Sequence, residues 1–290
     1  MAEVDPLAPN PRLDAESALA AVNATVAEPL VLLEAAHGGE IGAAFVRWPD
    51  GHQGVLTVAS SAAAARKATV PLDVARARGL PVPRYELIVP TCDAAALVQQ
   101  RLSGSPPDQV NLKLVRAMVD LVDRFADLLV GRDDVDVPDL YLRHSGPGYS
   151  VHDSLARYNN RSRALLRWIH SVGEQRPTPM CGWDLLHLDL QPSNVLVDDD
   201  GTITGIVDWD GIGRGDRRFC LVTMRFAVMQ QGAADGVCEW LDDTLAKRIE
   251  ADVLRGYWAA MSLRQVDWAI RHHQAGDVEA VLTLAESGMD

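Results

Sequence analysis

A short segment in the second half of this chain of 290 residues constrains its fold more than any other feature. It places Asp189 and Asn194 five residues apart, directly before an apolar strand, and it places Asp208 at the end of a second apolar strand. Residues 199–201, Asp-Asp-Gly, lie between the two strands and are typical of a tight hairpin turn. A hairpin folds the start of its first strand back beside the end of its second. We therefore expect Asn194 and Asp208 to lie close together.

These three polar side chains match the requirements of phosphoryl transfer. In that chemistry one carboxylate orients the attacking hydroxyl, while an amide oxygen and a second carboxylate hold magnesium against the phosphates of a nucleotide. Asp189 can take the first role, and Asn194 and Asp208 can take the second. His187 belongs to the same catalytic loop and is predicted to tether it rather than to act as a base. Each piece alone would often occur by chance, but their order along the chain is rare.

The sequence HLDLQPSNVLV and the later IVDWDGIGRGD resemble the catalytic segment of the aminoglycoside phosphotransferase family, within the protein-kinase-like superfamily. The resemblance extends over residues 28–285 and implies an α+β, bilobal protein-kinase-like fold. A small N-lobe with an antiparallel sheet, together with the hinge, is expected in residues 1–104, of which 1–25 form a loose tail or a leading helix. A larger, mainly helical C-lobe with the catalytic and substrate-binding residues is expected in 105–290.

Apolar stretches in the first hundred residues agree with such an N-lobe. The predicted strands are 30–36, 43–48, 54–59, 85–89 and a fifth that starts at residue 96. The resemblance implies that the backbone of Gln100, Arg101 and Leu102 meets the adenine of a bound nucleotide. The same lobe therefore supplies the expected nucleotide site.

A glycine-rich turn separates the first two predicted strands. Three glycines in five residues indicate only a tight turn, because glycine tolerates positive φ. In the context of the catalytic motif, the resemblance implies that Gly38, Gly39 and Gly42 lie over the phosphates.

One position departs from the kinase pattern. Kinases carry a lysine on the third strand, paired with a carboxylate on the following helix. Here Thr57 stands in its place, and Asp73 is the best match to the carboxylate. Three explanations follow: Arg66 or Lys67 reaches in to bind the phosphates, magnesium alone neutralises them, or the protein binds nucleotide poorly. We favour the first two, because both magnesium ligands are present.

Helical periodicity predicts the secondary structure of the C-lobe. The predicted helices are 110–128, 155–172, 219–231, 240–261, 263–275 and 277–286. Residues 132–152 are polar and are expected to form a loop that either shapes substrate access or merely connects two helices. The tripeptide Ala-Pro-Glu that ends a protein-kinase activation segment is missing, which favours a small-molecule acceptor.

Composition restricts the partners. The net charge of −13 disfavours nucleic acid as a partner, because an acidic surface repels the phosphate backbone. No apolar run is long enough to cross a membrane, and the first residues do not resemble a signal peptide. The four cysteines show no metal-binding or disulfide spacing. We expect a cytoplasmic protein, and the sequence leaves open whether it is a monomer or a dimer.

The same negative charge could concentrate a small cationic substrate. Most acidic residues of the C-lobe are expected to be solvated, and two or three to contact the substrate. Asp210 is the first candidate because it adjoins Asp208, and Glu239, Asp243 and Asp267 follow.

The resemblance implies an enzyme that uses Mg²⁺ and ATP, or GTP, to phosphorylate a hydroxyl of a small cationic molecule. An antibiotic is the preferred acceptor, either an aminoglycoside or a cationic cyclic peptide of the viomycin and capreomycin class, and its phosphorylation would give resistance. A kinase of a host metabolite such as an amino alcohol or a sugar would share every catalytic residue. The sequence is also compatible with a nucleotide-binding pseudokinase and, least of all, with a protein kinase.

Overall fold

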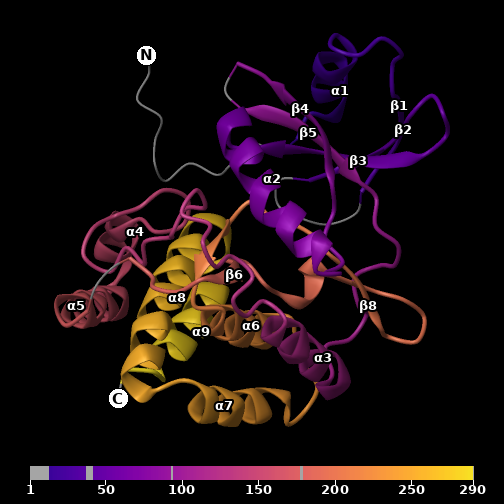
Figure 1. Ribbon diagram of the computed structural model, residues 1–290. Coiled ribbons are helices and arrows are strands. Elements are labelled where there is room, and N and C mark those ends of the chain that lie inside the picture. The colour runs from indigo at the N-terminus through magenta and orange to yellow at the C-terminus, as the bar shows by residue number, and fades with distance from the viewer. Residues whose placement is uncertain (1–12, 37–41, 93, 177–178, 290) are drawn as a thin grey trace.

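The computed structural model describes residues 13–36, 42–92, 94–176 and 179–289. A sheet-containing N-terminal part lies above a mainly helical C-terminal part, as predicted (Figure 1). The sheet is antiparallel and has the strand order β1-β2-β3-β5-β4. Its strands are β1 (Val31–Ala35), β2 (Ala44–Arg47), β3 (Gln53–Ala59), β4 (Tyr85–Pro90) and β5 (Ala95–Gln100). All five strands therefore lie where the apolar stretches predicted them.

The two faces of this sheet have different surroundings. Side chains alternate between the faces of a strand, and Val46 and Leu56 are fully buried beneath helix α1 (Ala15–Asn23). Phe45 and Val55, which pair across β2 and β3, lie on the opposite face. The first described residues thus form a leading helix that covers one face and leaves the other for the rest of the molecule.

Helix α2 (Ala62–Ala77) connects the two parts of the molecule. Ser61 caps its first turn by accepting a hydrogen bond from the N–H of Ala64 at 3.1 Å. Leu72 and Ala75 are fully buried and join the core of the helical part rather than the core of the sheet. The helix is therefore anchored in both parts of the molecule.

Two short antiparallel ribbons carry the catalytic segment. The predicted hairpin is present as β7 (Val195–Val197) paired with β8 (Ile203–Ile206). A second pair, β6 (Asp184–His187) with β9 (Ile212–Gly215), was not predicted. Because β6 ends just before Asp189 and β9 begins just after Asp208, this pair brings the two ends of the segment together.

Helices joined by loops, of which the longest precedes α4, make up the rest of the C-terminal part. They are α3 (Leu112–Asp123), α4 (His152–Tyr158), α5 (Asn160–Glu174), α6 (Arg218–Gln230), α7 (Val237–Arg248), α8 (Ala251–His272) and α9 (Ala275–Glu286). None of the helices in the described ranges is both long and apolar enough to cross a membrane.

Three of the helix predictions were wrong at their boundaries. The stretch expected as one helix over 155–172 is broken at Asn159, which caps α5. The stretches expected as separate helices at 240–261 and 263–275 are instead divided at Ile249 and Glu250, so that α8 runs without interruption for 22 residues.

Candidate active site

Asp189 lies at the centre of the predicted catalytic loop, held by two amide side chains. Its Oδ2 accepts hydrogen bonds from Gln191 Nε2 at 2.9 Å and from Asn194 Nδ2 at 3.2 Å. The same Asn194 nitrogen also donates to the Asp189 carbonyl at 2.9 Å. No described residue donates to Oδ1. One carboxylate oxygen is thus fixed by the loop, and the other remains available to accept a proton.

His187 connects this loop to the strand that precedes Asp208. Its Nε2 lies 3.0 Å from the Val207 carbonyl, and its Nδ1 accepts from the Asp189 N–H at 3.2 Å. A carbonyl only accepts, so Nε2 must carry the proton. Burial lowers the pKa of His187 and keeps it neutral. The arrangement matches the expected tether, because both ring nitrogens are occupied.

Trp209 packs against His187 and bonds to the strand that precedes Asp208. Its ring is buried, lies 4.4 Å from the His187 ring, and donates from Nε1 to the Ile206 carbonyl at 2.8 Å. Between these anchors Asp208 adopts a φ of 63°, a left-handed conformation that is uncommon for a residue other than glycine. Such strain persists only where the surroundings enforce it, and here the contacts of His187 and Trp209 hold the backbone on both sides of Asp208.

Asn194 and Asp208 fit a magnesium site that phosphates would complete. The Asn194 side chain donates through Nδ2, and no described residue donates to its Oδ1, so this oxygen can face a cation. No group of three or more His, Cys, Asp or Glu side chains able to hold a metal occurs in the described ranges. Magnesium in kinases is held by one or two protein ligands together with phosphate oxygens. The donor set therefore fits magnesium bound with a nucleotide.

Three carboxylates influence one another at this point. Asp208 is accessible to solvent, but the surrounding protein reduces its hydration, and this effect, followed by the charges of Asp189 and Asp210, raises its pKa to about 6. Reduced hydration also raises the pKa of Asp210. No described basic side chain forms an ion pair with any of the three. Asp210 is thus the one predicted substrate residue that the structure places beside Asp189 and Asp208.

The other three acidic residues lie elsewhere. Glu239 and Asp243 are exposed on α7, at the base of the helical part and far from β6 and β8 (Figure 1). Asp267 is completely buried in α8, where it pairs with Arg271 at 3.0 Å and accepts from Ser154 at 2.6 Å. The expectation that these residues contact substrate is corrected: two lie away from the site and the third stabilises the core.

The sheet turns the face with Phe45 and Val55 toward the catalytic segment. Val55 pairs with Gln99, and Gln99 pairs with Tyr85 on the same face. Burial raises the pKa of Tyr85, and the charges of Asp210 and Asp208 add to this effect. The Tyr85 ring therefore lies near the catalytic carboxylates, a proximity that the sequence had not revealed.

Thr57 lies on this same face, two residues beyond Val55. Lys67 does not replace the missing strand lysine, because its Nζ pairs with Asp136 of the helical part at 2.8 Å. Asp73 pairs with Arg76 on its own helix. The structure corrects the expected phosphate contact of Lys67. This residue instead joins α2 to the loop that contains Asp136.

The hinge residues 100–102 differ in which of their groups already have a partner. The N–H of Gln100 donates to the Arg84 carbonyl at 2.8 Å, whereas the N–H of Leu102 has no partner among the described residues. The Arg101 guanidinium stacks over Phe45, 3.9 Å from the ring centroid, and also bonds to Gln53. The Leu102 N–H is thus free to bind a base. Arg101 adds a positive charge to the sheet face that contains Phe45 and Val55.

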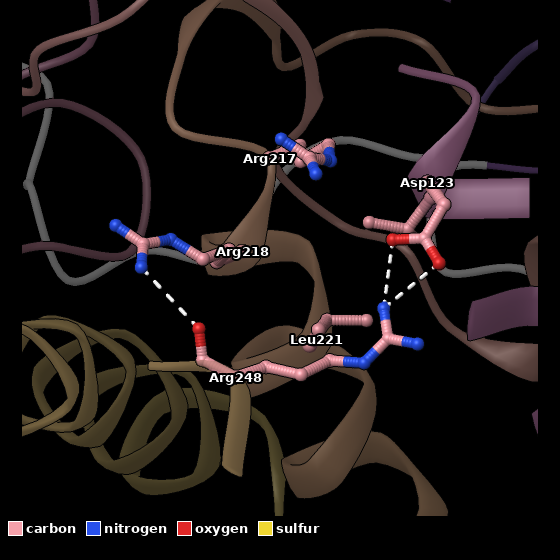
Figure 2. A pocket seen from close by; sticks show the side chains of 6 residues that line it. Asp123, Arg217, Arg218, Leu221 and Arg248 are labelled. Atoms are coloured by element: carbon pink, nitrogen blue, oxygen red, sulfur yellow. Dashed lines mark hydrogen bonds and ion pairs between the residues drawn. The ribbon is translucent and has the colours of Figure 1, made fainter. Parts of the chain in front are cut away.

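A cavity of 530 Å³ lies beside the hinge. Its lining residues are His52, Gln53, Arg84, Glu86, Gln100, Arg101, Leu102 and Ser103. Asp189, Asn194 and Asp208 do not line this cavity, so it is not the space for the phosphates. A smaller cavity of 170 Å³ lies among Asp123, Arg217, Arg218 and Arg248 on the helical part (Figure 2).

Two glycine predictions fall outside the described residues, namely those for Gly38 and Gly39. Gly42 is described and has a φ of 84°, as a turn requires. At the other end of the hinge, Gly104 has a φ of 94°, and a Cβ there would lie 2.6 Å from the Val197 carbonyl oxygen. The glycine after the hinge is therefore needed for the close approach of the hairpin.

Comparisons with known proteins define the class. The sequence profile of the phosphotransferase enzyme family matches residues 32–263, which is most of the chain. The chain belongs to this family, and the predicted class of enzyme is confirmed. No curated protein sequence matches it significantly.

Solved structures agree on the fold. A thermostable mutant of aminoglycoside phosphotransferase APH(4)-Ia matches with a TM-score of 0.64 at 17% identity, covering 90% of this chain and 94% of that one. Aminoglycoside-3'-phosphotransferase of type VIII matches with a TM-score of 0.58 at 18% identity, covering 86% and 98%. APH(3'')-Id from Streptomyces rimosus matches with a TM-score of 0.51 at 20% identity, covering 87% and 99%. The kinase-like architecture predicted from the sequence is confirmed.

Proposed function

We propose that this protein transfers the γ-phosphoryl group of ATP, with magnesium, to a hydroxyl of a small cationic antibiotic. The observation that carries the proposal is the geometry of the Asp189 carboxylate, which has one oxygen fixed by Gln191 and Asn194 and one oxygen free. A fixed carboxylate with a free oxygen is suited to orient a hydroxyl and accept its proton during in-line attack. The products are ADP and a phosphate monoester.

The roles of the remaining residues follow from their positions. Asn194 Oδ1 and the Asp208 carboxylate would hold magnesium, which would supply positive charge to the phosphates. His187 and Trp209 keep the loop and the strained Asp208 in register. The backbone of the hinge, with Leu102 N–H free, would receive the base of the nucleotide.

Two observations favour a cationic acceptor. Asp210 is exposed beside the catalytic carboxylates and forms no ion pair with any described residue. A structure of APH(4)-Ia in ternary complex with ADP and hygromycin B matches this chain with a TM-score of 0.63 at 18% identity, covering 96% of this chain and 98% of that one. Phosphorylation would add negative charge to a cationic antibiotic and weaken its attraction to ribosomal RNA.

Growth protection tests the proposal. A susceptible bacterium that expresses the chain is grown on a panel of aminoglycosides and cationic cyclic peptide antibiotics. We expect protection against at least one compound, and loss of protection with Asp189→Asn. Asp199→Asn is the matched control, since this exposed aspartate lies in the hairpin turn. If the panel gives no protection while the purified protein phosphorylates an amino alcohol or a sugar, the antibiotic assignment is wrong.

A further inference from the structure

Helix α8 turns one side toward the catalytic segment. Tyr257 Oη donates to Asp216 Oδ2 at 2.7 Å, just beyond β9. One turn further along α8, Met261 Sδ accepts from Thr223 Oγ1 at 3.5 Å, and Gln265 Oε1 then accepts from Gln230 Nε2 at 2.9 Å. The side of α8 that contains residues 257, 261 and 265 therefore packs against α6 and the segment after β9.

Helix α6 in turn touches the catalytic loop at two points. Cys220 Sγ approaches the His187 carbonyl at 3.5 Å, near the start of the helix. Just beyond its end, Gln231 Nε2 donates to Gln191 Oε1 at 3.1 Å. Gln191 is the residue that holds Asp189. A side chain on the inward side of α8, next to Gln265, is thus close to the loop that carries the catalytic carboxylate.

Arg264 occupies that position. It lies within electrostatic range of both Asp189 and His187, and burial lowers its pKa while the charge of Asp189 opposes this effect. An arginine nevertheless remains protonated in a protein. The residue is only partly exposed, yet it forms no hydrogen bond or ion pair with any residue in the described ranges.

Three other arginines of the helical part pair with carboxylates. Figure 2 shows Arg248 bonded to Asp123, at 2.7 Å. Arg217 pairs with Asp184 at 3.0 Å, and Arg218 with Asp216 at 2.8 Å. The cavity between them is therefore not an anion site. Arg264 differs because its guanidinium has no carboxylate partner among the described residues, and a partly buried cation without a partner is costly unless a ligand supplies one.

We propose that Arg264 binds the phosphoryl group during its transfer. This inference rests on the proposed function. The acceptor oxygen forms a bond to the γ-phosphorus, the bond from that phosphorus to the β,γ-bridging oxygen breaks, and the acceptor proton passes to Asp189. Negative charge on the phosphoryl oxygens thus passes close to Asp189, where a guanidinium fork is suited to bind them. With Thr57 in place of the strand lysine, Arg264 is a cation that the helical lobe supplies instead.

The chemistry of the ligand is an oxyanion, which could also belong to the acceptor. A carboxylate or phosphate on the acceptor would use the same guanidinium. An experiment without an acceptor distinguishes the two sources, because the transferred phosphoryl group is then the only one of them present.

Binding of a transition-state analogue tests the proposal without an acceptor. The probe is ADP with Mg²⁺ and aluminium fluoride, compared with ADP and Mg²⁺ alone, in titrations of wild type, Arg264→Met and Arg264→Lys. Arg255→Met is the control, because Arg255 is exposed on the same helix. We expect Arg264→Met to bind ADP with Mg²⁺ as wild type does, to bind the analogue at least tenfold more weakly, and to hydrolyse ATP about 10³-fold more slowly. Arg264→Lys should recover part of the analogue affinity.

Four results would overturn the inference. Wild-type affinity of Arg264→Met for the analogue would show that Arg264 does not touch the phosphoryl group, and a raised KM for an identified acceptor alone would assign it to the acceptor. Equal loss of both nucleotide complexes in Arg264→Met and Arg264→Lys, with a lower melting temperature, would assign it a structural role. If the wild type itself binds no ADP with Mg²⁺, the proposed function fails and this inference fails with it.

Discussion

Asp189 depends on its neighbours for its orientation. Gln191 and Asn194 both donate to one carboxylate oxygen, and Gln231 in turn holds Gln191. The first link is local and lies within the HxDxxxxN motif. The second joins residues 40 positions apart, so the sequence could not have revealed it.

Removal of the Gln191 amide should slow catalysis. We expect Gln191→Leu to lower kcat about 10²-fold, because misplacement of a reacting group by an ångström has such an effect. The KM for ATP should change little, since Gln191 touches no predicted nucleotide residue. Steady-state ADP release measures both constants. Gln230→Leu, which removes only the bond to Gln265, is the control. An unchanged kcat in Gln191→Leu would mean that Asn194 alone positions the carboxylate.

The ionisation of Asp208 should make magnesium binding depend on pH. Its raised pKa of about 6 means that the carboxylate is ionised above that pH and gains a proton as the pH falls through it. The proton must leave when the metal binds, so affinity for magnesium should decrease below pH 6 by about tenfold per pH unit. Titrations of magnesium-dependent ADP binding between acidic and neutral pH check this dependence.

Asp210→Asn provides a second arm of the same experiment. The charge of Asp210 is one cause of the raised pKa of Asp208. Its removal should therefore move the midpoint to lower pH. A midpoint that stays in place would show that the group that titrates does not sense the charge of Asp210. A profile that is flat across this range would show that Asp208 does not ligate the metal.

At the scale of elements, the sequence predicted those strands and turns that have a clear local signal. The strands of the sheet and the β7–β8 hairpin have clear apolar stretches and turns. The β6–β9 pair is a contact between four-residue strands far apart in the chain, one of which, Ile212–Gly215, contains two glycines. Neither strand has a pattern of its own, so only the folded chain reveals the pairing.

The break between α4 and α5 shows how a capping residue can override periodicity. Asn159 accepts from the Ser162 N–H at 2.9 Å, and Ser162 Oγ accepts from the Asn159 N–H at 3.0 Å. This capping box starts a new helix although the apolar spacing continues across it. Periodicity alone therefore predicted one helix where there are two.

Loss of this cap should destabilise the protein. We expect Asn159→Ala to lower the free energy of unfolding by about 1 kcal/mol, and Asn159→Ser, which keeps a capping oxygen, to lower it less. Urea unfolding followed by circular dichroism measures both. Asn160→Ala changes the adjacent exposed residue inside the helix and serves as the control. Equal stability of the Ala and Ser variants would show that the side-chain cap contributes little.

Helix α2 provides a test of the missing strand lysine. Lys67 and Asp136 are both largely exposed, and exposed ion pairs contribute little to stability. We expect Lys67→Met to leave the affinity for ADP with Mg²⁺ within about twofold of wild type and to change the melting temperature little. Calorimetric titration and thermal unfolding check the two outcomes. A large loss of nucleotide affinity would mean that Lys67 leaves Asp136 and binds phosphate.

For the whole molecule, the sequence was sufficient for the architecture and for the residues of the catalytic segment. Those residues lie within two dozen positions of one another, and the roles proposed for them rest on order and spacing. Prediction of substrate residues was less successful, since it relied on charge alone. Glu239 and Asp267 illustrate the reason: whether an acidic residue faces a site, the solvent or a buried arginine depends on helix packing that no local pattern encodes.

The central claim is that Asp189 directs phosphoryl transfer to a small hydroxylated acceptor. Its most direct test is mass spectrometry of the acceptors after incubation of the purified protein with ATP and Mg²⁺. The acceptors span aminoglycosides, cationic cyclic peptides, amino alcohols and sugars. We predict that one class gains a single phosphoryl group, in step with ADP, and that Asp189→Asn forms no such product although it still binds ADP with Mg²⁺. Product formation by Asp189→Asn at the wild-type rate, or no product from any acceptor while nucleotide binding is intact, would contradict the claim.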